Sequence, residues 1–348
     1  MPKTRLVSIK ELGEIREIRK SIIKVEGLSH CMVGQLVNVA DGGKGFVMGF
    51  NEKEVLVLLL GNPDKLRAGD KVYSESVTFK IPVGEKFLGR VVSPLCEPLD
   101  GKGNIRADAS FDIFRDAPQV MDRIPISEML STGIRVIDAV FPVGKGQRQL
   151  IIGDRMTGKT SIAVDTIVNQ KDKNVICIYC CVGRDYASFE KVVSIFKQKD
   201  VIDRMIIVSG IASLPIGEQY LAPYAAATLG EYFMHSGRDV VVVFDDLTKH
   251  AWTYRELSLL LERPPGREAY PGDIFYLHAQ LMERAGRLSS VAGAGSMTFF
   301  PIADTLHGDI AAFIPTNLIS MTDGQIYLSA GLFNEGFKPA VDLGLSVS

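Results

Sequence analysis

Two different patterns of apolar and polar residues divide this chain. In the first 84 residues, short apolar segments are separated by turn residues such as Gly, Asn, Asp and Pro. The segments predicted as strands are 21–25, 35–39, 45–50, 55–60 and 71–74. Several short strands at a spacing of about 8–12 residues indicate a small barrel or sandwich. We therefore predict a small N-terminal β-barrel over residues 1–84.

From residue 149 onward, the pattern changes to strands that alternate with helices. Continuous apolar runs predict strands at 150–153, 175–182, 205–209 and 240–244. Apolar residues at helical spacing predict helices at 159–170, 187–198, 216–235, 247–261 and 275–288. Such alternation is typical of a parallel sheet covered by helices on both faces. Residues 81–148 form a connector with a short helix predicted at 127–138, and we assign an α/β domain to residues 85–348.

A phosphate-binding loop stands between the first strand and the first helix of this second region. Residues 153–160 fit the pattern G-x-x-x-x-G-K-[ST]. Its glycines let backbone N–H groups surround an anion, and the helix N-terminus adds partial positive charge. We expect Lys159 to reach the terminal phosphates and Thr160 to place its hydroxyl on Mg²⁺. The candidate nucleotide-binding residues of this loop are Gly153, Asp154, Arg155, Met156, Thr157, Gly158, Lys159, Thr160 and Ser161.

A carboxylate for the metal is predicted at the end of another strand. Residues 240–244 are four valines and a phenylalanine, and Asp245 is the first polar residue after them. Ligands of open α/β sheets bind at the carboxyl ends of the strands. Asp245 is therefore the candidate metal ligand, together with Thr160. The alternative is that Asp245 caps the next helix, a role that we assign to Asp246 instead.

Composition and charge argue against several classes of protein. The formal net charge is −2 at pH 7, so no general attraction to nucleic acid or to an anionic membrane is expected. The predicted barrel has few aromatic residues and no basic run, unlike an oligonucleotide-binding barrel. No apolar run reaches the roughly 18 residues that would span a bilayer. No apolar signal core follows the first five residues, and a cytoplasmic protein is expected.

The cysteines offer a second candidate chemistry. Cys177 and Cys180 form a C-x-x-C pair, which could indicate a redox or zinc site. Both lie within the predicted strand at 175–182, where a period of two points their side chains to opposite faces. No second C-x-x-C accompanies them. We therefore interpret them as small buried apolar residues.

Several stretches together resemble one family, the alpha subunits of F-type ATP synthase. They are residues 153–161, 220–224, 259–273, 314–317, 322–326 and 344–348. The run Pro-Gly-Arg-Glu-Ala-Tyr-Pro-Gly-Asp at 265–273 is specific to this superfamily of ring ATPases. The Asp-Asp-Leu at 245–247, together with the form of the phosphate loop, favours alpha over beta. The similarity covers essentially the whole chain and implies a RecA-like phosphate-loop domain preceded by a β-barrel.

The resemblance implies a place in a larger complex. In it, alpha-type and beta-type subunits alternate in a hexameric ring around a central rotor stalk, with a peripheral stalk alongside. The complex lies on the cytoplasmic face of a membrane, as expected for a bacterial plasma membrane, and this subunit touches the membrane only through it. Mg²⁺ with ATP or ADP are the implied cofactors, and no nucleic acid is implied. Phe333 is implied to pack near the adenine ring; a core contact is the alternative.

The same resemblance implies a noncatalytic subunit, so no catalytic residue is assigned. The family's catalytic sites lie mainly in beta subunits, which carry a glutamate that activates water. Arg184 stands at the position of that glutamate, where alpha subunits usually have Gln. Arg184 is then either an exposed loop charge or a contact to the γ-phosphate. Met156 also stands where alpha usually has Gln. In the family, the stretch that matches residues 345–348 is followed by an arginine finger and a helical domain. The 348 residues stop before both. The sequence is then expected to be a fragment, a truncated chain or a divergent paralogue.

Two other functions remain open at this point. The first is an independent ring ATPase motor, of the secretion-system type or an RNA-translocating helicase. A secretion motor predicts a glutamate in place of Arg184, and a helicase predicts a barrel that binds nucleic acid. The second is a structural ring protein whose nucleotide site is vestigial, which a nucleotide titration would distinguish.

Overall fold

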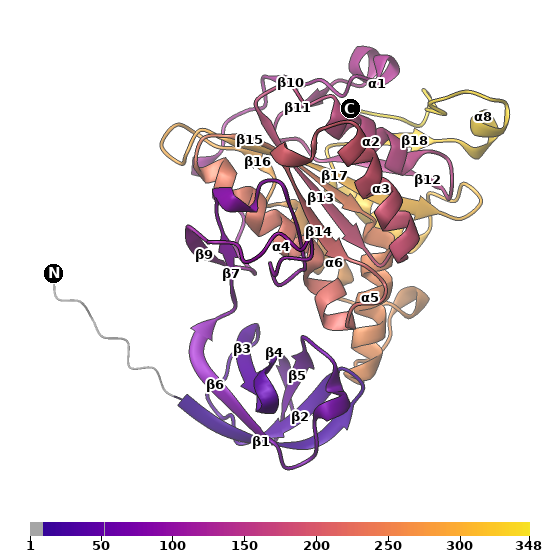
Figure 1. The fold of residues 1–348 in the computed structure, drawn as a ribbon. Helices are drawn as coiled ribbons and strands as arrows, with labels where there is room; N and C mark the ends of the chain where they lie inside the picture. The colour runs from indigo at the N-terminus through magenta and orange to yellow at the C-terminus, as the bar shows by residue number, and fades with distance from the viewer. Residues whose placement is uncertain (1–9, 52) are drawn as a thin grey trace.

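Six strands close into a barrel at the N-terminal end of the chain, drawn in indigo and purple in Figure 1. The computed structural model describes residues 10–51 and 53–348, and the barrel order within them is β1-β2-β5-β4-β3-β6. The strands are β1 (Lys10–Arg19), β2 (Ile22–Glu26), β3 (Gln35–Val39), β4 (Gly43–Phe50), β5 (Val55–Leu59) and β6 (Lys71–Thr78). All neighbours are antiparallel. The predicted barrel is confirmed, although β1 was not among the predicted strands.

The alternating side chains of β5 serve two different cores. Val55, Val57 and Leu59 point into the barrel and pack in its own aliphatic core. Leu56 and Leu58 point outward and join the core of the larger domain. At this junction, a Cβ added to Gly217 would lie 2.5 Å from the Leu59 carbonyl oxygen. The barrel is therefore docked closely on the second domain.

The connector contributes strands as well as loops. Within it, β7 (Lys80–Val83) and β9 (Ala109–Asp112) pair antiparallel, and β8 (Arg90–Val92) joins the edge of the main sheet. The helix predicted over 127–138 is wrong. That segment contains β10 (Met129–Leu130), paired with β11 (Val143–Gly144), and then α1 (Arg135–Val140). The reason is a turn in which the Asp138 carboxylate accepts hydrogen bonds from the backbone of Thr132 and Gly133.

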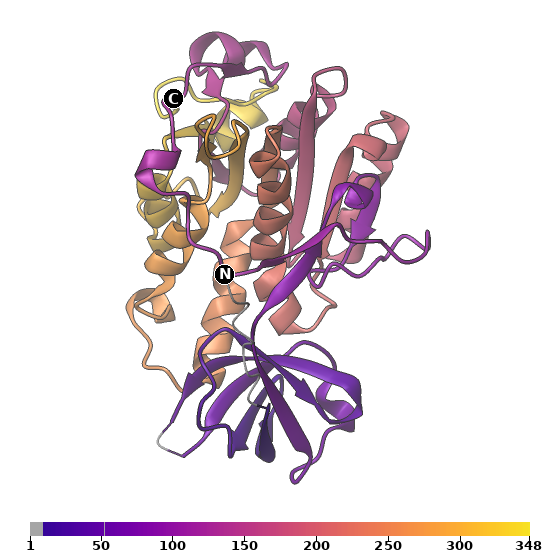
Figure 2. The same cartoon turned by 90° about the vertical axis from the view of Figure 1, so that its left-hand side faces the viewer.

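The second domain is built on a parallel sheet with the order β18-β12-β17-β15-β13-β14-β8. Its further strands are β12 (Gln149–Asp154), β13 (Val175–Val182), β14 (Met205–Gly210), β15 (Asp239–Asp245), β17 (Ser296–Thr305) and β18 (Gly324–Leu328). β16 (Gly286–Arg287) adds a short antiparallel pairing to β17. Figure 2 shows this sheet between its helices, above the barrel. The predicted α/β architecture is confirmed.

Helices cover both faces of the sheet, as predicted. On one face, α2 (Lys159–Val168) and α3 (Tyr186–Gln198) pack over one apolar core. The other core lies under four helices, α4 (Ile216–His235), α5 (Leu247–Leu260), α6 (Ile274–Met282) and α7 (Phe313–Met321). The predicted helix 275–288 ends too late, because Gly286 and Arg287 pair with β17 instead. A last short helix is α8 (Ala330–Asn334).

The interpretation of the C-x-x-C pair is confirmed. Cys177 and Cys180 are buried free thiols on opposite faces of β13, one in each apolar core. Within residues 10–51 and 53–348, no cluster of three or more His, Cys, Asp or Glu side chains could hold a metal ion. Among the same residues, no helix is both long and apolar enough to span a bilayer.

Candidate nucleotide-binding site

The phosphate-binding loop leaves the carboxyl end of β12 and enters α2. Its last glycine, Gly158, has φ of 105°, a left-handed conformation that glycine adopts without steric cost. This bend lets α2 begin at Lys159, so that its free N–H groups face the loop. Gly153 is needed for another reason, because a Cβ there would lie 2.4 Å from the Leu328 carbonyl oxygen. The strand, loop and helix thus form the anion-binding arrangement that the sequence predicts.

Lys159 is held at the floor of the loop. Its Nζ donates hydrogen bonds to the carbonyl oxygens of Gly153 (2.8 Å) and Asp154 (2.6 Å). It also lies 3.0 Å from Oδ1 of Asp304, with only 7% of its side chain exposed. Asp304 lies in β17, next to β12 in the sheet. Neither Asp304 nor the strand that presents it was predicted from the sequence.

Asp245 lies opposite the first turn of α2, at the carboxyl end of β15. Its Oδ2 accepts hydrogen bonds from Oγ1 of Thr160 (2.9 Å) and from the hydroxyl of Tyr179 (2.7 Å). The Arg184 guanidinium donates to the same oxygen. Asp245 is 2% exposed, and Tyr179 is fully buried in β13. The structure therefore brings together the two side chains predicted to hold Mg²⁺.

Arg184 is not the exposed loop charge that was one of the two expectations for it. Its side chain is 20% exposed and ion-paired with Asp245, so it is not an exposed loop charge. Its Nη1 also donates to Oγ1 of Thr160, at 2.9 Å. Burial disfavours the charged guanidinium, but the Asp245 carboxylate outweighs this effect, and the pKa of Arg184 is raised. A permanent cation therefore lies between the predicted metal ligands.

The neighbouring carboxylate, Asp246, has the capping role assigned to it. Its side chain accepts a hydrogen bond from the backbone N–H of Lys249 (2.7 Å) and so caps α5. Burial raises the pKa of Asp246 to about 7, while Lys249 opposes that shift. Asp185 is likewise used as a cap, because Ser188 donates to its Oδ1 and Oδ2 at the start of α3.

The other loop residues divide into anchors and exposed side chains. Oδ1 of Asp154 accepts from Oγ1 of Thr305 (2.6 Å), which ties the loop to the end of β17. Thr157 is buried and donates to the carbonyl oxygen of Asp154. Met156 is 90% exposed. Nε of Arg155 is 3.3 Å from Asp304, and its guanidinium lies 5.5 Å from the ring centroid of Trp252.

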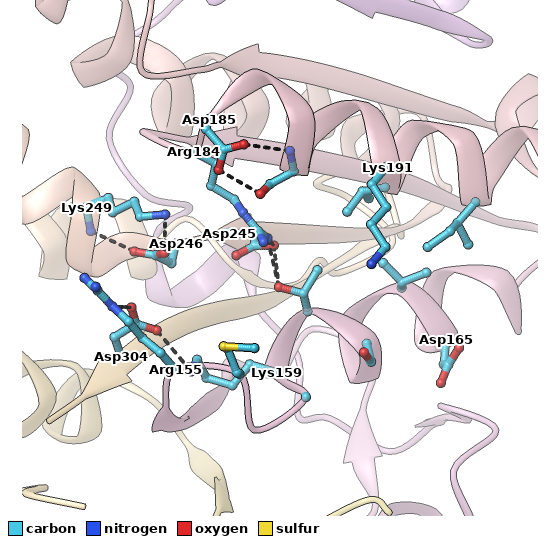
Figure 3. A pocket seen from close by; sticks show the side chains of 18 residues that line it. Arg155, Lys159, Asp165, Arg184, Asp185, Lys191, Asp245, Asp246, Lys249 and Asp304 are labelled. Atoms are coloured by element: carbon cyan, nitrogen blue, oxygen red, sulfur yellow. Dashed lines mark hydrogen bonds and ion pairs between the residues drawn. The ribbon is translucent and has the colours of Figure 1, made fainter. Parts of the chain in front are cut away.

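A cavity of about 810 Å³ opens above these residues (Figure 3). The figure shows Arg155, Lys159, Arg184, Lys191 and Lys249 around it, interleaved with carboxylates from several strands and helices. Ser161, on the first turn of α2, lines this cavity and also a smaller neighbouring one. An anionic ligand at the loop would thus meet positive charge from the loop itself and from α2, α3 and α5.

Phe333 lines the smaller cavity, of about 260 Å³, on the far side of the loop. Thr157, Gly158 and Pro339 also line it, so this cavity borders the phosphate loop directly. The Phe333 ring is half-buried in α8, and Nζ of Lys338 lies 5.4 Å from its centroid. The structure places Phe333 at the edge of the candidate site, in a space open to a ligand.

Comparison with known proteins gives a consistent result. The profile of the ATP synthase alpha/beta family, nucleotide-binding domain, matches residues 133–348. ATP synthase subunit alpha of Petrotoga mobilis is 51% identical over 344 residues, which are 98% of this chain and 68% of the relative. The Acholeplasma laidlawii subunit alpha is 50% identical with the same two coverages. Nitrosospira multiformis has an ATP synthase subunit alpha 2 that is 51% identical over 99% of this chain and 67% of its own length.

Proposed function

Because this chain belongs to the ATP synthase alpha/beta family, we propose that it is a nucleotide-binding, noncatalytic alpha-type subunit of a rotary, proton-translocating ATP synthase. The observation that carries the proposal is the cavity above the phosphate loop, with Arg184 where catalysis would require a carboxylate. The likeness to subunits named alpha, along nearly the whole chain, favours this function over an independent ring motor.

ATP or ADP would bind with its phosphates in the loop. Backbone N–H groups at the start of α2 and the ammonium of Lys159 supply the positive charge. Lys159 is at present paired with Asp304, and a phosphate would draw it away from that partner. The cationic side chains that surround the cavity suit a ligand with several negative charges. The adenine ring would lie toward Phe333, across Gly158 and Ser161.

Thr160 and Asp245 are the residues that would hold Mg²⁺. Their side chains are hard oxygen donors 2.9 Å apart, the ligand type that Mg²⁺ prefers. When bound, Mg²⁺ would neutralise part of the phosphate charge. A site with one carboxylate and one hydroxyl takes its remaining ligands from water and from the nucleotide. The donor set therefore fits a metal that arrives with the nucleotide.

Three features support a noncatalytic role. Hydrolysis needs a group that orients the attacking water, and Arg184 cannot accept a proton at the position concerned. Asp185, the next carboxylate along the chain, uses Oδ1 and Oδ2 to cap α3. Asp245 is engaged by Thr160, Tyr179 and Arg184. The chain would bind nucleotide and support turnover at sites in neighbouring beta-type subunits.

The partners proposed for this chain follow from its family. They are beta-type subunits in an alternating hexameric ring, a central rotor stalk and a peripheral stalk, with no nucleic acid. The complex would lie on the cytoplasmic face of a bacterial plasma membrane. The near-neutral formal charge of −2 agrees with membrane contact through other subunits rather than through this one.

Calorimetric titration with ATP tests the proposal. Lys159→Ala removes the charge that faces the phosphates and should weaken binding by about 10–100-fold, as expected for a charged hydrogen bond of ~1.5–3 kcal/mol. Thr160→Ala should reduce the gain in ATP affinity that Mg²⁺ provides. Lys86→Ala, an exposed lysine far from the loop in sequence, is the matched control and should bind like the wild type.

An ATPase assay of the isolated chain tests the noncatalytic role. We expect negligible turnover, even at saturating ATP. Substantial hydrolysis without a partner chain would contradict this role and favour the independent motor. Equal affinity in wild type and Lys159→Ala would instead indicate that the loop is vestigial.

A further inference from the structure

Arg184 lies where Mg²⁺ is expected. It follows β13 directly, whereas Thr160 belongs to α2 and Asp245 to β15, so three separate elements meet at this point. The Nη1 atom of Arg184 donates to both Thr160 and Asp245. Figure 3 shows the Arg184 side chain reaching down from its loop to Asp245. The two proposed metal ligands thus already share one cation.

The Oδ2 atom of Asp245 has no free place for a metal ion. A carboxylate has about four lone-pair sites, or two for each oxygen. Oδ2 of Asp245 already accepts from Thr160, Tyr179 and Arg184. The hydroxyl of Thr160 donates its hydrogen to Asp245 and uses a lone pair for Arg184. A metal could reach this oxygen of Asp245 only by displacing one of its donors.

The charge balance points the same way. Asp245 is almost fully buried, and without a cation it would repel the phosphates of a nucleotide in the loop. Arg184 supplies that cation permanently, because a guanidinium does not lose its proton in proteins. It has five N–H donors, and among the described residues its hydrogen bonds run through Nη1. Its other donors are available to phosphate oxygens, which a guanidinium binds well.

We propose that Arg184 replaces much of the electrostatic role of Mg²⁺ at this site, so that the chain binds metal-free ADP or ATP nearly as well as the Mg²⁺ complex. This inference rests on the proposed function, because it requires a nucleotide in the same cavity. It concerns the form of the nucleotide that is recognised. Mg²⁺ must compete with Arg184 for Oδ2 of Asp245, and it therefore adds little to the affinity.

Calorimetric titrations with ATP, in excess Mg²⁺ and in excess EDTA, test this inference. For the wild type, we expect the two Kd values to agree within about threefold. For Arg184→Gln, the Kd in EDTA should exceed the Kd in Mg²⁺ by about tenfold or more. Arg184→Met removes the same charge without adding a polar group, and it should give the same ratio of Kd values. It serves as the second variant if Arg184→Gln folds poorly.

Lys191→Gln provides the matched control. Lys191 lines the same cavity from α3, and in the described structure it touches neither Thr160 nor Asp245. Its removal takes one positive charge from the cavity, so both Kd values should rise together and their ratio should stay that of the wild type. A ratio that rises as much as in Arg184→Gln would overturn the special role of Arg184.

A direct metal measurement supplies a second readout. Mn²⁺ can be titrated in place of Mg²⁺ into the ADP-saturated protein and its free fraction followed by electron paramagnetic resonance. Arg184→Gln should bind Mn²⁺ more tightly than the wild type, by about tenfold. Equal Mn²⁺ affinity in the two proteins, or a wild type that needs Mg²⁺ as much as the variant does, would overturn the inference. Absence of nucleotide binding in both EDTA and Mg²⁺ would instead overturn the proposed function.

Discussion

The barrel and the parallel sheet bury their strands in similar ways but present polar groups differently. In β5 and in β13, every residue is buried, so both strands pack on two sides. The barrel closes antiparallel strands around an aliphatic core. In the sheet, β12, β13, β15 and β17 all run parallel, and their carboxyl ends meet at one edge with Asp245, Arg184 and Asp304. The charged side chains therefore lie together because the strands run parallel, and the burial of the strands contributes less to this arrangement.

A matched pair of core substitutions, one in each region, should give the largest effects and distinguish the barrel from the sheet. Ile23 in the barrel and Ile151 in β12 are both fully buried. Ile23→Ala and Ile151→Ala should each lower the free energy of unfolding by about 2–5 kcal/mol. Only Ile151→Ala should also weaken ATP binding, by about 3–10-fold, because β12 positions the phosphate loop. Denaturant unfolding and calorimetry measure the two effects. A similar loss of affinity in Ile23→Ala would mean that the two regions are coupled.

The junction between the two regions can be broken at Gly217. Alanine is normally favoured over glycine inside a helix. At Gly217, however, its Cβ would meet the Leu59 carbonyl oxygen at 2.5 Å, so the barrel must shift. We expect Gly217→Ala to cost about 1–3 kcal/mol of stability, measured by denaturant unfolding. Gly61→Ala is the control, since nothing lies within 4 Å of its added Cβ, and it should change stability by less than about 0.5 kcal/mol.

Phe333 tests how far the ligand site extends from the sheet edge. If its ring stacks on the adenine, Phe333→Ala should lose about 1–3 kcal/mol of ATP binding, by analogy with base–aromatic stacking. Phe333→Tyr keeps the ring and should retain most of the affinity. Calorimetry and a thermal melt, taken together, separate binding from packing. An unchanged Kd with a lowered Tm would assign Phe333 to the core instead.

The smallest expected effect is a pH dependence at the same junction. Glu218 begins α4 beside the barrel, and burial, with a smaller contribution from Glu97, raises its pKa to about 7. A carboxyl with a raised pKa in the folded state contributes stability below its unfolded pKa, and that contribution is lost as the pH rises through about 7.

Glu218→Gln should therefore raise the Tm at about pH 8, by about 2–4 °C, and leave it nearly unchanged at about pH 4.5. Glu256→Gln, at an exposed position of α5, should show no such difference between the two pH values. Equal shifts for Glu218→Gln at both pH values would show that the carboxylate is not destabilising when ionised.

Most of the barrel and the outline of the sheet could be predicted, because continuous apolar runs such as 175–182 and 240–244 mark buried strands. β17 could not be predicted, although it lies in the middle of the sheet. It contains Pro301 and the polar Ser296 and Thr298, which argue against a central strand. Those polar groups are satisfied by distant partners, since Ser296 donates to Asp239 and Thr298 accepts from the backbone of Gly146.

The candidate site was predicted in part for a related reason. A loop motif and a strand end indicate Lys159, Thr160 and Asp245, since local pattern determines them. Asp304 depends on β17, so it was missed with that strand. The Arg184 side chain is long and flexible, and it points toward a carboxylate about 60 residues away in the sequence. No local sequence pattern predicts this orientation.

The position of Trp252 makes the protein its own optical reporter. It is the single tryptophan of the chain, so all indole fluorescence comes from α5. The ring is partly exposed and faces the guanidinium of Arg155, a phosphate-loop residue that also pairs with Asp304. Ligand entry that draws Arg155 toward phosphate would change the electric field at the indole. The emission of this one residue would then follow occupancy of the loop in real time, without a label.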